Sequence, residues 1–423
     1  MSPSSMGPQA APNPGLLRSP SSLRKIGLLG SLYFSQGLPF GFFTLAIPVL
    51  LRKGGSSLGE TTLSYLLSLP WALKFVWAPL LDRVGSPSFG RRRSWIVPMQ
   101  LATVVVLVGV ALRDPAGAFS FLLGAVFVVN LLSATQDIAT DGFAVDMLDE
   151  AERGLANGVQ VAGYRLGMIV GGGALPVLFD RAGARPTFLL MALLIALASI
   201  PILATRERPA RLPPLGAPAE AAGILQFLRV PGAPRVMALL VIYKLGEAFA
   251  TGVLRQFLFD AGLSLGDIGK LVGTVGFVAG LLGALAGGAL VNRLGRKRAL
   301  VGFAVLQLLT VAGYAYIARG VPGWGALAAI CAAEHFGSGM ATAALFTCMM
   351  DWCRPNTTAS DYTIQACAVV IATGLASTLS GFSAQALGYF RHFAVATLLA
   401  GASIAAVHWL FPRSFPAAKE QIP

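Results

Sequence analysis

The chain has 423 residues, of which 55% are hydrophobic and only 12% are charged, and its mean hydropathy is +0.70. Soluble domains usually carry about 25% charged residues, so this composition excludes an ordinary soluble enzyme, a disordered protein and a secreted disulfide scaffold. The net charge of +13 does not indicate a nucleic-acid partner, because the basic residues lie in short segments between apolar runs. A polytopic membrane protein remains.

Apolar runs of about 20 residues, the length of a membrane-spanning helix, recur along the whole chain. The Pro- and Ser-rich residues before the first run predict a disordered cytoplasmic tail at residues 1–25. The longest interruption lies between the sixth and seventh runs and is rich in Pro and Arg. The twelve predicted spans cover residues 26–50, 60–82, 95–112, 118–146, 152–179, 186–204, 233–259, 266–291, 299–318, 324–350, 361–388 and 393–411.

This interruption predicts a cytoplasmic linker at 205–232 that joins two six-helix bundles at 26–204 and 233–412, with a tail at 413–423. The predicted fold class is an all-α polytopic membrane protein with twelve transmembrane helices in two pseudo-symmetric bundles. If the N-terminus is cytoplasmic, 20 of the 32 Lys and Arg residues fall in cytoplasmic segments. Because basic residues favour that side of the membrane, both termini are predicted to be cytoplasmic.

Two copies of one motif follow the second and the eighth predicted span. The first reads Asp-Arg-Val-Gly and resumes after a four-residue insertion as Gly-Arg-Arg-Arg, and the second carries Asn292 where the first has an acid. Arg can clamp a carboxylate of a neighbouring helix, so each hairpin predicts a gating latch, the second weaker than the first. The alternative is that these bases only anchor the topology. The predicted latch residues are Asp82, Arg83, Arg91, Arg92, Asn292, Arg293, Arg296 and Lys297.

These hairpins resemble the signature of the major facilitator superfamily, which reads roughly G-x-x-x-D-R-x-G-R-R/K. Further motifs of the first half resemble the AmpG-like group, which includes muropeptide permeases, acetyl-coenzyme A transporters and siderophore permeases. The resemblance implies the twelve-helix fold of that superfamily and secondary active transport by alternating access. The motifs that carry it lie at Tyr33–Gly41, Pro70–Arg83, Ser133–Asp141 and Gly163–Met168.

Ionisable residues inside the predicted spans are site candidates, because charge inside a bilayer is costly. Asp137 and Asp141 lie four residues apart on one helix face, where repulsion and burial favour a proton on one of them. Arg165 is the expected ion partner of Asp137, because both come out at a similar depth when each helix rises about 1.5 Å per residue. Lys74 and Gln36 fall in the same layer, which predicts a cargo site near the midplane.

Structural interpretations stand beside these functional ones. Asp137 and Arg165 could form an ion pair that only stabilises the fold. Lys74 could instead extend its ammonium to the membrane surface, as long basic side chains near a membrane face do. Arg255 and Lys270 lie near the ends of predicted spans, and for both we expect the side chain to extend its charge to the membrane surface.

In the second half, Lys244 and Glu247 are spaced to pair locally, and Glu334 stands beside His335. A Glu next to a His could relay protons, although a His satisfied within a core is the more common case. The predicted cargo and proton-coupling residues are Gln36, Lys74, Gln136, Asp137, Asp141, Tyr164, Arg165, Lys244, Glu247 and Glu334.

The sequence contains no nucleophile–base pair, metal cluster or nucleotide-binding loop, so no enzyme activity, metal or cofactor is expected. We predict a monomeric inner-membrane importer that uses protons to carry a bulky polar solute, with lipid and the small-molecule cargo as its partners. Muropeptide permeases have further C-terminal helices, so the resemblance favours the shorter, siderophore-type relatives. A carrier of acetyl-coenzyme A or another organic anion, a membrane-embedded enzyme and a channel are the alternatives.

Overall fold

The computed structural model describes residues 20–53, 67, 69–113, 119–207, 223–320 and 322–412, and the regular structure of these residues is helical. Apolar composition produces this result, because long runs of Leu, Ala and Val satisfy their backbone groups within each helix. The first half contains α1 (Pro20–Lys53), α3 (Leu69–Leu73), η3 (Lys74–Val76), α4 (Ala78–Arg83), α5 (Arg93–Leu112), α6 (Phe119–Met147), α7 (Glu150–Ile169), η5 (Val170–Ala174), α8 (Leu175–Ala182) and α9 (Ala184–Ala204).

The second half repeats this plan after the linker. One of its membrane segments is interrupted, because α11 ends at Thr251 and α12 starts only at Leu254. Its elements are α10 (Ile224–Arg229), α11 (Ala233–Thr251), α12 (Leu254–Asp260), α13 (Leu265–Ile268), η6 (Gly269–Gly276), α14 (Phe277–Leu294), α15 (Arg296–Ile317), α16 (Trp324–Asp351), α17 (Thr358–Leu387) and α18 (Tyr389–Leu410).

The predicted twelve-helix class is confirmed. Nine segments of the described residues are long and apolar enough to cross a membrane, and α1, α16 and the segment from α3 to α4 occupy the other three predicted spans. The start of the second predicted span, 60–66, lies outside the described residues. Residues 20–25, predicted as part of a tail, are helical and belong to α1, and α10 lies inside the predicted linker.

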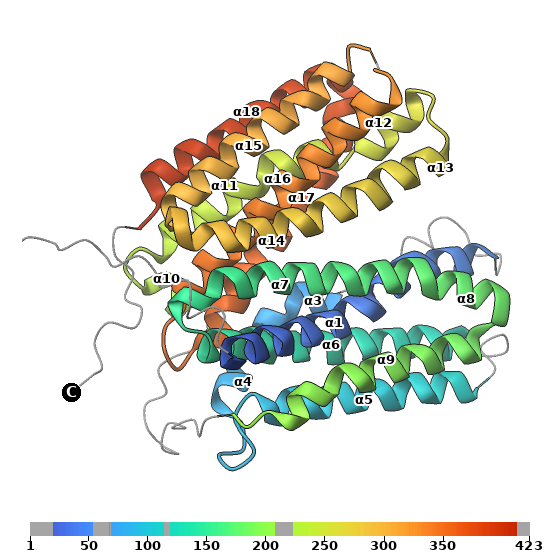
Figure 1. The fold of residues 1–423 in the computed structure, drawn as a ribbon, viewed down its shortest axis with the longest axis vertical. Helices are drawn as coiled ribbons and strands as arrows, with labels where there is room; N and C mark the ends of the chain where they lie inside the picture. Colours follow the sequence, from blue (N-terminus) through green and yellow to red (C-terminus); the bar gives the residue numbers. More distant parts are fainter. Residues whose placement is uncertain are drawn as a thin grey trace, which may run out of the picture.

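The two bundles pack side by side, with α1 to α9 in one and α11 to α18 in the other (Figure 1). They meet at the end where α4 and α16 stop and α7 and α17 start, which we call the latch end. Toward the end that carries α8 and α13, which we call the open end, the two sets of helices diverge (Figure 1). Among the described residues, the contacts that join the two halves are therefore concentrated at the latch end.

Glycine allows the halves to touch at the latch end. Gly158 of α7 lies against α14, and a Cβ added to it would come within 2.7 Å of the Ala284 carbonyl oxygen. A Cβ on Gly154 would come within 2.6 Å of the carbonyl oxygen of Gly288. Backbones this close leave no room for any side chain, so the small residues are a condition of this closure.

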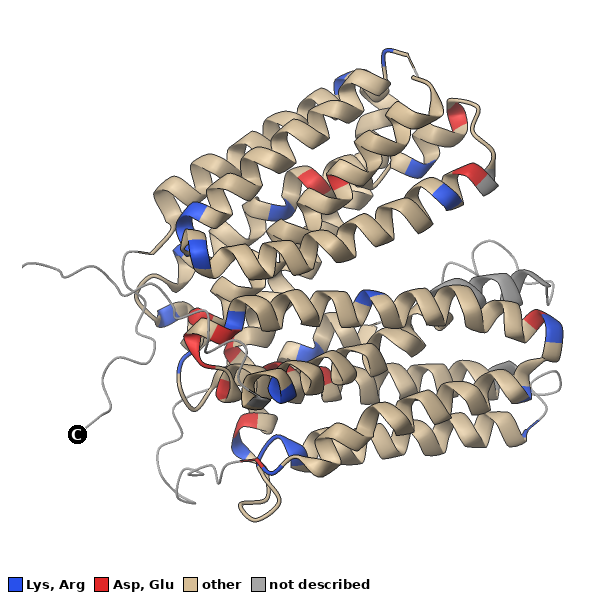
Figure 2. Ribbon diagram, viewed as in Figure 1, with Lys and Arg blue, Asp and Glu red and all other residues tan. Residues whose placement is uncertain are grey.

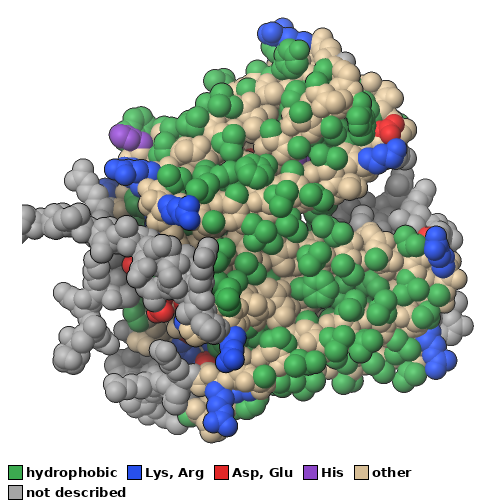
Figure 3. Space-filling model, viewed as in Figure 1, with side chains coloured by type: hydrophobic (Ala, Val, Ile, Leu, Met, Phe, Trp, Pro, Cys, Tyr) green, Lys and Arg blue, Asp and Glu red, His purple; other side chains and the backbone are tan. Residues whose placement is uncertain are grey.

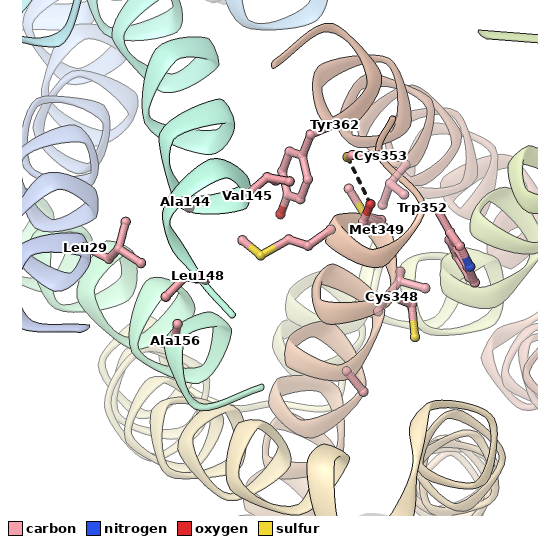
Figure 4. Packing of buried hydrophobic residues seen from close by; sticks show 14 of the residues in the cluster. Leu29, Ala144, Val145, Leu148, Ala156, Cys348, Met349, Trp352, Cys353 and Tyr362 are labelled. Carbon is pink, nitrogen blue, oxygen red and sulfur yellow. Dashed lines mark hydrogen bonds between the residues drawn. The ribbon is translucent and has the colours of Figure 1, made fainter. Parts of the chain in front are cut away.

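Apolar residues from both halves form one core at the latch end. Figure 4 shows members of this core from both halves: Leu29, Leu148 and Ala156 from the first, and Cys348 and Met349 from the second. All four cysteines of the chain, Cys331, Cys348, Cys353 and Cys367, are free and buried, as small apolar residues in a core often are.

The exterior of the bundles suits lipid. Large apolar side chains such as Leu309, Leu398 and Val105 are exposed on the flanks of the helices, and Figure 3 shows hydrophobic atoms covering the face between the two ends. Lys and Arg gather at the latch end and at the open end (Figure 2). A few charged residues lie midway along the helices, between the two ends, and they belong to the site.

Candidate functional site

A cavity of about 510 Å³ lies between the two halves, on the open side of the latch-end core. Both bundles contribute to its wall, among others through α1, α6 and α7 of the first and α12, α16 and α17 of the second. It is lined by Tyr33, Trp71, Lys74, Asp137, Asp141, Gln160, Val161, Tyr164, Arg165, Met168, Arg255, Val272, Phe277, His335, Thr342, Phe346, Tyr362, Ala366 and Val370.

Two acids and one lysine form the charged cluster of the first half. Lys74 is buried and makes an ion pair with Asp137, and its Nζ also lies 4.0 Å from Oδ2 of Asp141. The hydroxyl of Tyr33 donates a hydrogen bond of 2.5 Å to Asp141. Two carboxylates thus share one ammonium, which leaves an excess negative charge that one proton would neutralise.

The predicted Asp137–Arg165 ion pair is wrong, and so is the alternative in which Lys74 reaches the membrane surface. The segment of Lys74 is held against α6, because the indole of Trp71 donates to Asn130 at 3.0 Å and that of Trp77 to Thr135 at 3.2 Å. The short 3-10 turn η3 then directs Lys74 toward the acids of α6. Depth alone could not reveal this, since it says nothing about the direction of a side chain around its helix.

Arg165 points instead toward the second half. Its guanidinium lies against α14 at Gly280, where an added Cβ would overlap it. Glu247 and Glu334 are the carboxylates whose field acts on it, and it makes no salt bridge with any residue that the structure describes. Tyr164 beside it, another predicted site residue, also lines the cavity.

Gln36 and Gln136, two of the predicted site residues, do not line the cavity. Both are buried, and their amide nitrogens donate to Thr140 at 3.3 Å and to Ser35 at 3.2 Å. These bonds join α1 to α6 behind the charged cluster. The amides therefore position the helices that carry Tyr33 and the acids rather than facing a solute.

In the second half, Lys244 and Glu247 form the predicted local ion pair. The carboxylate of Glu247 also accepts hydrogen bonds from Gln307 at 2.6 Å and Ser338 at 2.5 Å. Lys244 donates to Thr342 at 3.1 Å, and only Thr342 of this group lines the cavity. This pair is therefore placed one layer behind the wall.

Glu334 and His335 are in contact, as a proton relay would require. Nδ1 of His335 lies 2.8 Å from a Glu334 oxygen and 3.0 Å from the carbonyl oxygen of Cys331. The same carboxylate accepts a hydrogen bond of 3.0 Å from Tyr314. His335 lines the cavity while Glu334 lies behind it, so the ring is the accessible member of the pair.

Arg255 is a cavity residue that the sequence analysis assigned to the membrane surface. It is the second residue of α12, after the interruption that follows Thr251, and it lines both the main cavity and an adjoining one of about 320 Å³. The signal in the sequence is the pair Gly252-Val253, which interrupts the helix and redirects the next segment. Lys270, by contrast, is exposed and pairs with Asp267 at 3.3 Å.

The first latch crosses between the halves at the start of α17. Asp82 is buried and accepts hydrogen bonds from the backbone nitrogen and hydroxyl of Ser360, at 2.8 and 2.5 Å. Arg92 donates to Asp82 at 2.7 Å, to Asp146 at 3.0 Å and to Thr358 at 2.7 Å. Burial would lower the pKa of Arg92, but Asp146 and Asp82 outweigh it and raise that pKa, so the guanidinium stays charged. An acid here also satisfies free N–H groups of a helix terminus.

The predicted Arg91 belongs to the first latch as well, through Asp146 at 3.1 Å. The linker contributes one residue that the sequence analysis missed, because Glu207 accepts hydrogen bonds from the backbone nitrogens of Arg92 and Arg93, at 3.0 and 2.9 Å. It thereby caps α5. The first latch is thus tied to the linker as well as to α17.

The second latch holds the start of α7 in the same way. Arg296 binds Asp351 at 2.6 Å and Asn292 at 2.5 Å. Asn292 donates in turn to the backbone oxygen of Ala151 at 2.5 Å, and Arg153 of α7 binds Asp351 at 2.8 Å. The amide at position 292 therefore bridges an arginine of one half to the backbone of the other.

Three predicted latch residues take no part in these contacts. Arg83 and Arg293 are exposed and make no salt bridge with the residues that the structure describes. Lys297 donates to the backbone oxygen of His408 at 3.1 Å, within the second half. Arginines that follow the acid or amide directly point away from the interface, because neighbouring residues on a helix do not share a face.

Comparison with known proteins decides the family. A family model described as Major Facilitator Superfamily matches residues 29–331 and 237–423. The chain belongs to the major facilitator superfamily. The chain is 30% identical to the anhydromuropeptide permease of Escherichia coli (strain K12) over 380 residues, 88% of this chain and 77% of that protein. These results place it in the AmpG-like group of the superfamily and confirm the resemblance seen in the sequence.

Other relatives agree. This AmpG-like transporter is 24% identical to a Rickettsia felis protein named putative transporter AmpG 4, over 86% of this chain and 91% of that one. It is 28% identical to an uncharacterised protein of Haemophilus influenzae over 92% and 95% of the two chains. Its fold matches the crystal structure of FucP, a major facilitator transporter in the outward conformation, with a TM-score of 0.70 at 12% identity over 92% and 99% of the chains. The chain is therefore a multi-pass membrane transporter of small molecules.

Proposed function

We propose that this transporter carries an anhydromuropeptide, or a bulky polar solute of similar chemistry, into the cytoplasm together with protons. The observation that carries the proposal is the cluster of Asp137, Asp141 and Lys74, which lines a cavity between the halves. A cavity-lining acid whose charge is not fully neutralised can take up a proton and give it back. The similarity to a protein named anhydromuropeptide permease supports the cargo class.

The asymmetry of the two ends supports alternating access. The glycine contacts and both latches close the latch end, whereas the helices diverge at the open end (Figure 1). With the latch end in the cytoplasm, as the distribution of Lys and Arg favours, this is the outward-facing state. One chain supplies both halves, so we propose that a monomer completes the cycle.

The charge count supports proton coupling. While both acids are ionised, Lys74 is attracted to Asp137 and Asp141 together, and the cluster has one negative charge in excess. A proton on one acid removes that excess and weakens the hold on Lys74, which frees the cluster to rearrange. Because charge is costly in a low-dielectric site, occupancy by the proton and the position of the halves become linked.

The test is uptake by proteoliposomes of a radiolabelled anhydromuropeptide, with an inward proton gradient that a protonophore can collapse. We expect accumulation above the external concentration only while the gradient is present. Accumulation that persists after the protonophore would refute proton coupling, and absence of any uptake would refute the cargo.

A competition arm separates the remaining cargo classes. Unlabelled muropeptide, ferric siderophore and acetyl-coenzyme A are added in turn to the same vesicles. We expect muropeptide to compete best, and preferential competition by a siderophore would instead favour a siderophore as the cargo. Empty liposomes and liposomes with a heat-denatured sample serve as controls.

A further inference from the structure

We propose that Arg165 and Arg255 form an anion subsite that holds a carboxylate of the cargo between the two halves. This inference rests on the proposed function and deepens it, because it states which chemical group the second-half wall of the cavity recognises. It gives the cavity two poles: the acids and Lys74 on the first half, and two arginines at the boundary with the second.

Arg165 supplies the first guanidinium. It belongs to α7 of the first half, yet it reaches α14 at Gly280, where the position of a Cβ lies 3.2 Å from the carbonyl oxygen of His335. The absence of a side chain at Gly280 is what admits the guanidinium to this place. Arg165 and the His335 backbone are therefore neighbours on the second-half wall.

Arg255 supplies the second guanidinium of the proposed subsite. It shares the main cavity with Arg165 and His335, and it shares the adjoining cavity of about 320 Å³ with His335 and Val272. His335 is thus a wall residue of both cavities. Within the part of the chain that the structure describes, Arg255 makes no salt bridge, and it is an exposed residue that lines the cavity.

The charges around this pole leave both arginines available. Glu334 is occupied by His335 and Tyr314, and Glu247 by Lys244, Gln307 and Ser338. Across the cavity, Asp137 and Asp141 are held by Lys74. Among the charged residues that line the cavity in the described part of the chain, only the two arginines lack an opposite charge in salt-bridge contact.

Two guanidinium groups in one cavity match a carboxylate. Each presents a planar fork of N–H donors that can bind both oxygens of a carboxylate at once. Because one arginine belongs to each half, an anion bound by both is sensitive to the distance between the halves. Cargo would then favour one arrangement of the halves over another, as alternating access requires.

The first experiment compares two cargoes in proteoliposomes: an anhydromuropeptide with free peptide carboxylates, and the same compound with those carboxylates amidated. In the unsubstituted protein we expect amidation to raise KM by about 10- to 100-fold, the range for a hydrogen bond between charged groups. Arg255→Gln should raise KM for the free acid by a similar factor and leave KM for the amide unchanged. Equal effects of Arg255→Gln on both cargoes would overturn the proposal.

Arg319→Gln is the matched control. Arg319 lies in the turn after α15 in the same half, but it stacks on Phe390 at 4.5 Å and does not line the cavity. Its loss removes the same charge from the same half without touching the subsite. We expect both cargoes to keep the KM values of the unsubstituted protein, so that a general effect of net charge is excluded.

The second experiment does not depend on the cargo. Gln256 lines the adjoining cavity beside Arg255, so Gln256→Cys gives a thiol at the pole, and the four native cysteines are buried. The measured quantity is the labelling rate of an anionic methanethiosulfonate divided by that of a cationic one. We expect this ratio to be about tenfold higher in Gln256→Cys than in the Gln256→Cys, Arg255→Gln double variant. An unchanged ratio overturns the subsite even if muropeptide uptake is absent, whereas a changed ratio without uptake refutes only the proposed cargo.

Discussion

The two halves of this transporter share one plan of helices but use charge differently at the latch end. In the first half, a buried acid, Asp82, binds the start of α17. In the second, Asn292 occupies the equivalent place and binds the start of α7 through its amide. The acid of the second latch is instead Asp351, which joins Arg296 of its own half to Arg153 of the other. A duplicated motif can thus keep its contacts when one acid is replaced, provided that another carboxylate binds the arginine.

The charged clusters inside the bundles differ more. Lys74 and its two acids line the cavity, whereas Lys244 and Glu247 lie behind the wall in a network of neutral donors. We take this to mean that the first cluster changes its state during transport and the second holds helices together. Substitutions in the two halves can test that division, from the largest effect to the smallest.

Replacing an acid of the cavity wall should have the largest effect. We expect Asp137→Asn to cut proton-driven accumulation to below about a tenth, because a loss of about 1.4 kcal/mol of coupling is already tenfold. The measurement is the steady-state ratio of internal to external cargo in proteoliposomes. Glu247→Gln is the counterpart, which should lower the melting temperature and leave coupling intact at the temperature of the assay. If Glu247→Gln abolished coupling and Asp137→Asn did not, the roles of the halves would be reversed.

The first latch should respond to loss of its acid more than the second responds to gain of one. Asp82→Asn places a donor against the N–H groups of α17 and leaves Arg92 short of a partner, which costs about 3 kcal/mol for a buried pair. Asn292→Asp should cost less, about 1 kcal/mol, because it loses the amide donor to the Ala151 oxygen but gains an ion pair with Arg296 at a partly exposed site. Thermal unfolding and spin-label distances between the halves measure both effects. Similar responses in the two variants would contradict the asymmetry of the latches.

A smaller effect is expected where glycine seals the interface. Gly158→Ala forces a methyl group against the Ala284 carbonyl, and overpacking of this kind costs about 1–3 kcal/mol. We expect the latch end to open more often, which cysteine accessibility from that side would report. Gly109→Ala on α5 is the matched control, since nothing lies within 4 Å of an added Cβ there. Equal accessibility in the two variants would mean that the close approach is not required for closure.

The exposed pair of the open end should matter least. Ser264 and Lys270 hold the pKa of Asp267 below its usual range. Because the pKa of Asp267 is lower in the folded chain than in the unfolded one, any contribution of this pair to the stability is present at pH values above the unfolded pKa. It is lost as the pH falls through the folded pKa. Lys270→Ala should leave the melting temperature unchanged at neutral pH. The buried Lys244–Glu247 pair has the same three-residue spacing, so Lys244→Ala should clearly lower the melting temperature. Equal effects of the two substitutions would show that burial does not decide the strength of these pairs.

Hydropathy and repetition were sufficient to determine the class of the molecule. Twelve apolar segments, a polar linker in the middle and two matching hairpins each depend on local composition, and lipid imposes the same helical solution on every such segment. The latch residues followed from the motif in part, since Asp82, Arg92, Asn292 and Arg296 were identified and Asp146, Asp351 and Glu207 were not. Those three lie outside the repeated motif, and their role becomes visible only when helices distant in sequence are adjacent.

The partners inside the membrane were decided by tertiary structure. Counting the rise per residue placed Lys74, Asp137 and Arg165 at similar depth, but a pairing also depends on the direction in which each side chain leaves its helix. A 3-10 turn held by two tryptophans directs Lys74 to the acids, a glycine on α14 receives Arg165, and an interrupted helix brings Arg255 into the cavity. Each of these depends on a packing contact between segments far apart in the chain, which is why composition and spacing determined the fold while tertiary packing determined the site.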